Sequence, residues 1–197
     1  MQPSYRFQTD WFSPTIDEWT ETLAEYIAKP NVSFLEIGSF EGRSAVWLLE
    51  NILTDPASHL TCVDTWHGSA EHEGTGLDFH KVEHNFDHNI LISGKSQQVI
   101  KIKGFSAIEL KKLAIDSYDF VYIDASHKAS NVLEDAVLSW QLLKVGGIMI
   151  FDDYVWEPQY GEIDSPKLAV DAFAQCYRDK LEILREGMQM TIRKISS

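Results

Sequence analysis

Cysteine is scarce in this sequence and long apolar segments are absent, and each of these facts excludes a class of protein. Two of the 197 residues are cysteine, too few for a disulfide framework or a cysteine-rich metal site. We expect both Cys62 and Cys176 to be small buried hydrophobes. No apolar run approaches the roughly 20 residues of a transmembrane helix, and the first ten residues lack a secretory signal. We therefore expect a cytoplasmic protein without a membrane partner.

Positive charge is also scarce. The chain has 17 basic and 30 acidic residues, for a formal net charge of −13. A protein that binds phosphate backbones needs a basic face, and the densest group of lysines is Lys101, Lys103, Lys111 and Lys112. A solvated strand and helix explain these four residues. We expect no nucleic-acid partner.

The length and the 44% apolar content are typical of one compact domain, residues 1–197. The opening segment, residues 1–30, predicts a helix with Ser13 as its N-cap and Pro14 at its first position. Its aromatic residues either pack against the core or close over a substrate.

From residue 32 onward, apolar strand-like runs alternate with amphipathic segments, which predicts an α/β fold with a parallel sheet covered on both faces. Gly146 and Gly147 predict a turn before the fifth strand. A closing antiparallel hairpin is expected after the last helix, joined at residues 185–187. The predicted strands cover residues 32–37, 60–63, 98–102, 118–123, 148–151, 181–184 and 188–195, and the predicted helices after the opening segment cover 43–53, about 79–90, 106–114, 132–143 and 166–178.

Polar or glycine-rich residues follow all five parallel strands, although the strands themselves are apolar. In an open parallel sheet, the carboxyl ends of the strands form the ligand-binding edge. We therefore expect these residues to converge on one site, and they are Glu36, Gly38, Gly42, Asp64, Gly104, Ser106, Asp124, His127, Asp152 and Asp153.

The loop after the first strand, residues 36–44, places two glycines where the backbone must turn tightly near a ligand. It lacks the G-x-G-x-x-G spacing of dinucleotide-binding proteins. Glu36 would repel a phosphate but suits a cationic amine or sulfonium. Asp64 could accept hydrogen bonds from ribose hydroxyls. The alternative is a plain strand-to-helix turn.

Three carboxylates, Asp124, Asp152 and Asp153, are expected at adjacent strand ends, where they would repel one another. A bound cation would relieve this repulsion, and oxygen ligands favour Mg²⁺, Mn²⁺ or Ca²⁺ over zinc. The alternative is that one aspartate caps a helix and another faces solvent. His127 could act as a general base on a hydroxyl or, alternatively, cap the following helix.

Histidines are concentrated between His67 and His88, and His80, His84 and His88 recur every four residues. On a helix they form one stripe. This stripe is a polar or packed face, a lid that touches the substrate, or a separate metal site.

The run Glu36-Ile-Gly-Ser-Phe-Glu-Gly-Arg-Ser-Ala-Val46 closely resembles motif I of the catechol O-methyltransferase group of class I methyltransferases. Residues 104–106 resemble the adenine-side loop of that group. Residues 124–128, with the later Gly-Gly and Asp-Asp-Tyr, are similar to the bacterial branch that includes macrolide-sugar O-methyltransferases. The resemblance implies a Rossmann-like, seven-stranded sheet that binds S-adenosylmethionine and a divalent cation.

Carried over position by position, the resemblance assigns the methionine end of the cofactor to the first loop, with Ser44 at its carboxylate. Asp64 would bind the ribose, and Ser106 and Trp66 the adenine. The implied cofactor-binding residues are Glu36, Gly38, Ser39, Phe40, Gly42, Ser44, Asp64, Thr65, Trp66, Gly104, Phe105, Ser106 and Asp124, and the implied metal ligands are Asp124, Asp152 and Asp153.

Three positions depart from the catechol pattern. Asp64 replaces a glutamate, Asp153 replaces an asparagine, and His127 stands where those enzymes have their catalytic lysine. Asp124 and His127 are the expected catalytic residues. The predicted function is methyl transfer from S-adenosylmethionine to a hydroxyl of a small sugar, glycoside or phenol. The alternatives are a nucleotide-linked oxidoreductase and a non-catalytic binding protein, and homo-oligomerisation is left open.

Overall fold

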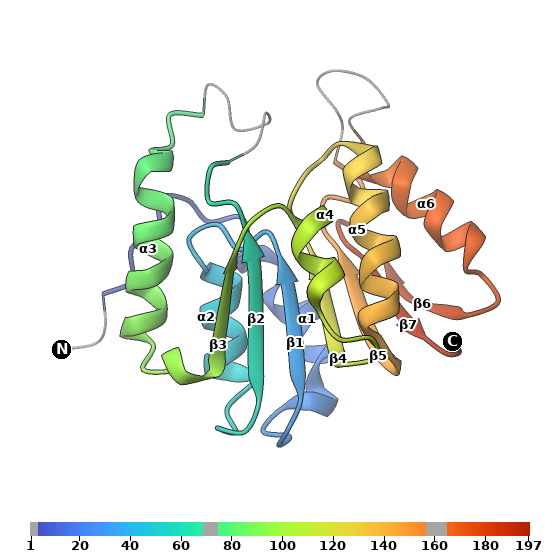
Figure 1. The fold of residues 1–197 in the computed structure, drawn as a ribbon, viewed down its shortest axis with the longest axis horizontal. Coiled ribbons are helices and arrows are strands. Elements are labelled where there is room, and N and C mark those ends of the chain that lie inside the picture. The colour runs from blue at the N-terminus through green and yellow to red at the C-terminus, as the bar shows by residue number, and fades with distance from the viewer. Residues whose placement is uncertain (1–3, 69–74, 157–164) are drawn as a thin grey trace.

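A seven-stranded sheet forms the centre of the computed structural model, which describes residues 4–68, 75–156 and 165–197 (Figure 1). The strand order is β3-β2-β1-β4-β5-β7-β6. The first five strands are parallel, and the last two add antiparallel pairs at one edge. The strands are β1 (Ser33–Ile37), β2 (His59–Asp64), β3 (Val99–Lys103), β4 (Tyr118–Ile123), β5 (Leu143–Phe151), β6 (Leu181–Glu186) and β7 (Met190–Lys194).

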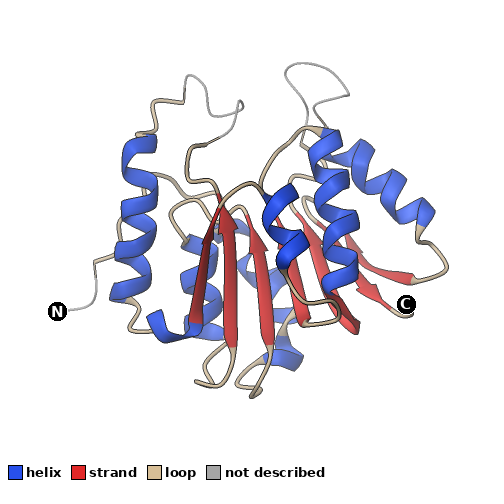
Figure 2. Cartoon of the chain, viewed as in Figure 1, coloured by secondary structure: helices blue, strands red, loops and turns tan. Residues whose placement is uncertain are grey.

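Helices cover both faces of the sheet (Figure 2). One apolar cluster lies between the sheet and α1, α2 and α3, and a second lies between the sheet and α5 and α6. The helices are α1 (Ile16–Thr22), α2 (Arg43–Asn51), α3 (Phe79–Ile92), α4 (Ser106–Glu109), α5 (Ala129–Leu142) and α6 (Pro166–Cys176), with 3-10 turns at Ser13–Thr15, Ala24–Tyr26, Ser96–Gln98 and Leu110–Lys112.

Alternation along the central strands divides their side chains between the two clusters. In β4, Phe120 and Tyr122 face the first cluster, whereas Val121 and Ile123 face the second. Both faces are apolar because both are covered, as expected for a parallel sheet. The predicted fold class is confirmed, down to the C-terminal antiparallel pair.

The boundaries of several elements differ from the prediction. The opening helix is broken into a 3-10 turn, α1 and a second 3-10 turn, and Ser13 lies inside the first turn instead of capping a helix. Its backbone N–H and hydroxyl both donate to Asp10, at 2.9 and 2.8 Å. Asp10 therefore anchors the start of this segment by accepting those two hydrogen bonds.

Three further predictions about the second half were wrong in detail. Gly146 and Gly147 lie within β5, where the register with β4 shifts, instead of forming a turn before it. The hairpin turn lies after Glu186 because β6 continues through Arg185 and Glu186. Cys176 is exposed at the last residue of α6, whereas Cys62 is buried as expected.

No helix among the described residues is both long enough and apolar enough to span a bilayer.

Candidate active site at the carboxyl ends of the strands

The loop after β1 touches the end of β4 at Gly38. The backbone of Gly38 has φ +87°, and a Cβ atom at this position would lie 1.9 Å from the carbonyl oxygen of Asp124. The chain is held there by two backbone bonds, from Gly38 N to Val63 O (2.9 Å) and from Asp124 N to Ile37 O (2.8 Å). Only glycine fits this position. The glycine loop and the acidic strand end are therefore in direct contact.

Glu36 precedes this loop in β1 and is fully buried. Its side chain lies on the same face of β1 as Phe34, which belongs to the first apolar cluster. The Ser44 hydroxyl donates to its Oε1 at 2.6 Å, and the Cys62 thiol lies 3.6 Å from its Oε2. Burial raises the pKa of Glu36 to about 7, and the Ser44 hydrogen bond only partly opposes this effect. Glu36 is thus a buried acid that a nearby cationic group would stabilise in its ionised form.

Asp64, at the end of β2, organises the same loop. Its Oδ2 accepts hydrogen bonds from the backbone N–H groups of Ser39 and Phe40, both at 2.8 Å, and its Oδ1 accepts from Trp66 N at 2.6 Å. The carboxylate therefore fixes the shape of the first loop. Its contact with a ribose stays a prediction.

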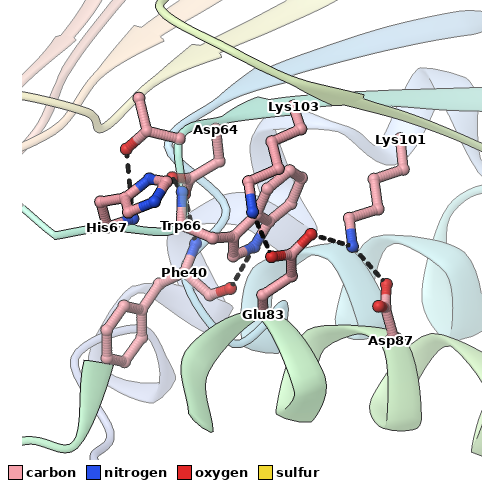
Figure 3. Close-up of polar contacts among 9 residues, drawn as sticks. Phe40, Asp64, Trp66, His67, Glu83, Asp87, Lys101 and Lys103 are labelled. Atoms are coloured by element: carbon pink, nitrogen blue, oxygen red, sulfur yellow. Dashed lines mark hydrogen bonds and ion pairs between the residues drawn. The ribbon is translucent and has the colours of Figure 1, made fainter. Parts of the chain in front are cut away.

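Trp66 is buried, and Figure 3 shows its polar contacts. Its indole N–H donates to the carbonyl of Phe40 at 2.9 Å, and the ammonium group of Lys101 lies 4.6 Å from its ring centre. Lys101 also pairs with Glu83 and Asp87, at 3.0 and 2.6 Å. The predicted adenine contact of Trp66 is not tested, and the described contacts give the ring a structural role. Thr65 accepts a bond from the backbone N–H of His67 at 3.3 Å.

The loop after β3 lies beside the end of β2, because Gly104 N donates to Asp64 O at 2.9 Å. Phe105 is 68% exposed. Ser106 begins α4, and burial raises the pKa of nearby Asp135 to about 6, an effect that the Ser106 side chain partly opposes. The predicted contact of Ser106 with adenine stays a prediction.

The acidic strand ends do converge. Ligand atoms of Asp124, His127 and Asp153 all lie within 4.8 Å of one another, and His127 Nε2 is 2.7 Å from Asp153 Oδ2. Burial, followed by the charges of Asp152 and Asp153, raises the pKa of Asp124 well above its usual value. In the described part of the chain, no lysine or arginine forms an ion pair with these acids.

Asp152 lies next to this group but uses its oxygens differently. Its Oδ2 accepts from the Tyr122 hydroxyl at 2.5 Å, and its Oδ1 accepts from Gln189 Nε2 and from Asp153 N, both at 2.9 Å. The compact set therefore contains His127 in place of the Asp152 that the sequence suggested, and the role of Asp152 as a metal ligand stays a prediction.

Tyr122 and Gln189 were missed by the sequence analysis. Tyr122 precedes Asp124 by two residues in a strand, so both project from the same face of the sheet, and this spacing could have identified it. Its hydroxyl also lies 2.9 Å from Asp124 Oδ2. No sequence signal marks Gln189, which reaches the site from the last hairpin.

The predicted histidine stripe lies on α3, where two of its members contact the N-terminal segment. His88 Nε2 lies 3.2 Å from the carbonyl of Ser4, and His84 Nε2 lies 3.4 Å from the guanidinium of Arg6. These contacts favour the interpretation of a packed polar face. His72, which belongs to the same histidine-rich stretch, lies outside the described residues.

The N-terminal segment also contacts the first loop. Glu41 is buried and accepts bonds from Gln8 N (2.6 Å) and from Asn85 Nδ2 (2.7 Å). The exposed ring of Trp11 lies 5.4 Å from that of Phe40 in the same loop. Residues 4–12 therefore line the first loop, and a substrate-covering role for residues 1–30 stays a prediction.

Comparison with known proteins agrees with this geometry. Residues 35–154, more than half of the chain, match a family described as a methyltransferase domain. An uncharacterized protein, R132 of Acanthamoeba polyphaga mimivirus, is 27% identical over 144 residues, covering 71% of this chain. The chain spans 60% of the length of that relative.

Solved structures share the fold at low sequence identity. A putative rRNA-methylase from Clostridium thermocellum has a TM-score of 0.71 at 14% identity, with 93% of this chain and 97% of that chain covered. The O-methyltransferase TomG from Streptomyces achromogenes, in complex with S-adenosylmethionine, has a TM-score of 0.69 at 15% identity. The match covers 95% of this chain and 82% of that chain.

A third structure is MycE methyltransferase of the mycinamycin biosynthetic pathway, in complex with Mg, S-adenosylhomocysteine and mycinamycin VI. It has a TM-score of 0.62 at 15% identity, with 95% of this chain and 51% of that chain covered. The glycine loop, its contact with the acidic strand end and the match over residues 35–154 agree with one another. This chain therefore belongs to the methyltransferase-domain family, and its resemblance to class I methyltransferases is confirmed.

Proposed function

We propose that this methyltransferase moves the methyl group of S-adenosylmethionine to a hydroxyl oxygen of a small molecule, assisted by a divalent cation. The observation that carries the proposal is the contact between Gly38 and the backbone of Asp124. It brings a loop suited to a sulfonium nucleoside directly against a group of acids. A donor and an acceptor bound at these two places would be neighbours, as an in-line displacement requires.

Glu36 and the first loop support the choice of cofactor. A buried acid with a pKa of about 7 gains from a cationic partner, and the amine of S-adenosylmethionine is one. Gly38 and Gly42 both have positive φ, which lets the loop fold closely around a ligand. The complexes of TomG and MycE with this cofactor or its product add support from the same fold.

The donor set of Asp124, His127 and Asp153 suits a cation. Two carboxylates and one imidazole can bind Mn²⁺ or Mg²⁺, with positions left for water and substrate. Such an ion, when bound, lowers the pKa of a hydroxyl that contacts it. Asp124 and Asp153 would hold it, and His127 would either complete the site or hold the proton that leaves the acceptor.

A small hydroxylated molecule is the proposed acceptor. Two neighbouring hydroxyls can contact one ion together, which favours a vicinal diol or a phenol of the catechol type. The net charge of −13 disfavours RNA. We place the protein in the cytoplasm, since Cys62 and Cys176 are both free thiols. We take residues 1–197 as one domain.

Titration calorimetry and a methyl-transfer assay on a panel of diols and catechols test the proposal. We expect micromolar binding of S-adenosylmethionine, loss of activity in EDTA and recovery with Mg²⁺. Asp124→Asn should lower kcat by at least about a thousandfold, because it removes a charged ligand from the reacting edge.

The matched control is Asp119→Asn, at the other end of β4, where the carboxylate binds Lys144 and Ser33 N. This variant should keep its kcat even if its stability falls. Full activity in EDTA would reject the cation, and binding of NAD in place of S-adenosylmethionine would reject the cofactor.

A further inference from the structure

Four side chains close a ring of contacts behind the acidic group. The Trp19 indole N–H donates to Gln189 Oε1 at 2.7 Å, and Gln189 Nε2 donates to Asp152 Oδ1 at 2.9 Å. The Tyr122 hydroxyl contacts Asp152 Oδ2, and the Tyr122 ring lies edge-on to Trp19, with 4.7 Å between ring centres. The members come from α1, the β6–β7 turn, the residue after β5, and β4.

The order of this ring is chemically determined. An indole N–H can only donate, so the Gln189 oxygen must face Trp19. The Gln189 amide nitrogen must then face Asp152, whose Oδ1 accepts its hydrogen bond at 2.9 Å. Trp19 therefore sets the orientation of an amide that could otherwise flip, and all four polar groups find partners.

Burial makes the ring rigid. Trp19 is fully buried, and Gln189 and Tyr122 are each 2% exposed. A buried polar group without a partner costs about 1–3 kcal/mol, so the amide has a strong reason to keep this orientation. Any rotation of the Asp152 carboxylate would break its bonds to both Gln189 and Tyr122.

The ring ends on a proposed cation ligand, because the Tyr122 hydroxyl also lies 2.9 Å from Asp124 Oδ2. We propose that Gln189, oriented by Trp19, is a positioning residue that holds Asp152 and Tyr122, and through them Asp124, in the geometry that binds the cation. This inference rests on the proposed function. It gives the first helix and the last hairpin a part in the chemistry of this site.

Mn²⁺ binding, measured by electron paramagnetic resonance with the cofactor present, tests the positioning role without an activity assay. Gln189→Leu removes the amide, and Gln189→Glu keeps the acceptor for Trp19 but puts a carboxylate against Asp152. We expect each to weaken Mn²⁺ binding about tenfold or more, as the loss of an outer-shell partner does at other metal sites. Trp19→Phe keeps a ring but removes the donor, and should weaken binding severalfold.

The matched control is Gln98→Leu. Gln98 is also buried, and its amide donates to the carbonyls of Leu53, Asp55 and Ser58, away from the acids that follow β4 and β5. It should lower the melting temperature while leaving the Mn²⁺ dissociation constant within about twofold of wild type, because it removes only structural hydrogen bonds.

Affinity for S-adenosylmethionine should change by less than about twofold in the Gln189 and Trp19 variants, since they do not alter the first loop. Wild-type Mn²⁺ affinity in folded Gln189→Glu and Trp19→Phe proteins would overturn the positioning role while the proposed function stands. A wild-type protein that binds S-adenosylmethionine but no Mn²⁺ would overturn both the cation and this inference.

Discussion

Charged side chains gather in two regions of this protein, and the two are organised in opposite ways. At the outer edge of β3, Lys101 and Lys103 both pair with Glu83 on α3, and the group is partly exposed (Figure 3). At the ends of β4 and β5, Asp124, Asp152 and Asp153 lie together, and their described partners are hydroxyls, amides and one histidine. The first region is balanced in charge and the second is not.

The difference in charge balance bears on where a ligand would bind. Paired lysines and acids on an edge strand satisfy one another and also discourage unwanted strand pairing. Like charges held together in a partly buried place cost free energy, and a structure keeps them where a cation or substrate repays that cost when bound. We therefore propose that the unbalanced region carries the chemistry and that the balanced one supports the fold.

The largest effect is expected at Gly38, where the loop after β1 touches the backbone at the end of β4. Gly38→Ala places a Cβ 1.9 Å from a carbonyl oxygen, in addition to the strain of positive φ. We expect it to lower the free energy of unfolding by about 4 kcal/mol, measured by urea denaturation.

Gly146→Ala is the matched control, because Gly146 has φ +89° but no atom within 4 Å of its added Cβ. It should cost only the backbone strain, about 1 kcal/mol. Equal losses in the two variants would show that the contact between the loop and β4 is not tight.

The second effect concerns pH. The folded protein holds a proton on Glu36 between its ordinary pKa of 4.5 and its raised pKa of about 7, whereas the unfolded chain has released it. The contribution of Glu36 to stability should therefore be greatest below pH 4.5, fall as the pH rises to 7, and level off above that value. The contribution of Glu36 is about 3 kcal/mol.

Subtracting the pH profile of Glu36→Gln isolates this contribution from those of the other acids, since glutamine does not titrate. A difference between the two profiles that is flat from pH 4.5 to 7 would contradict the raised pKa of Glu36 and weaken the contrast between the two regions.

The smallest effect is expected in the balanced region. Glu83→Gln removes the shared partner of Lys101 and Lys103, and should lower the free energy of unfolding by about 0.5 kcal/mol because the pairs are partly exposed. The loss should shrink further in 1 M salt. A loss above about 2 kcal/mol would mean that this edge also matters for the core, through the Lys101 contact with Trp66.

Much of the fold could be predicted because hydrophobic periodicity is local. The five parallel strands and the helices between them were located, although β5 begins five residues before the predicted start, since each pattern depends only on neighbours in the chain. The opening helix and the turn at residues 185–187 were wrong in detail. Asp10 takes both donors of Ser13, and pairing with β7 extends β6, and neither effect can be read from local periodicity.

For the candidate site, the sequence predicted which residues converge but not which partners they bind. The convergence of Glu36, Gly38, Asp124 and Asp153 follows from one rule about parallel sheets, which is why it could be anticipated. The exact partners could not be anticipated. Asp64 accepts three backbone N–H groups and Asp152 binds Tyr122 and Gln189, and these bonds depend on side-chain directions across loops.

The sequence by itself determined the alternation of strands and helices, the glycine loop and the set of acids at the strand ends, because each is written in residue type and spacing. Tertiary structure alone decided that His127 joins Asp124 and Asp153, and that Trp19 and Gln189 stand behind Asp152. Trp19 and Gln189 are separated by 170 residues. Hydrogen bonding over such a separation depends on how the sheet folds, and no local pattern encodes it.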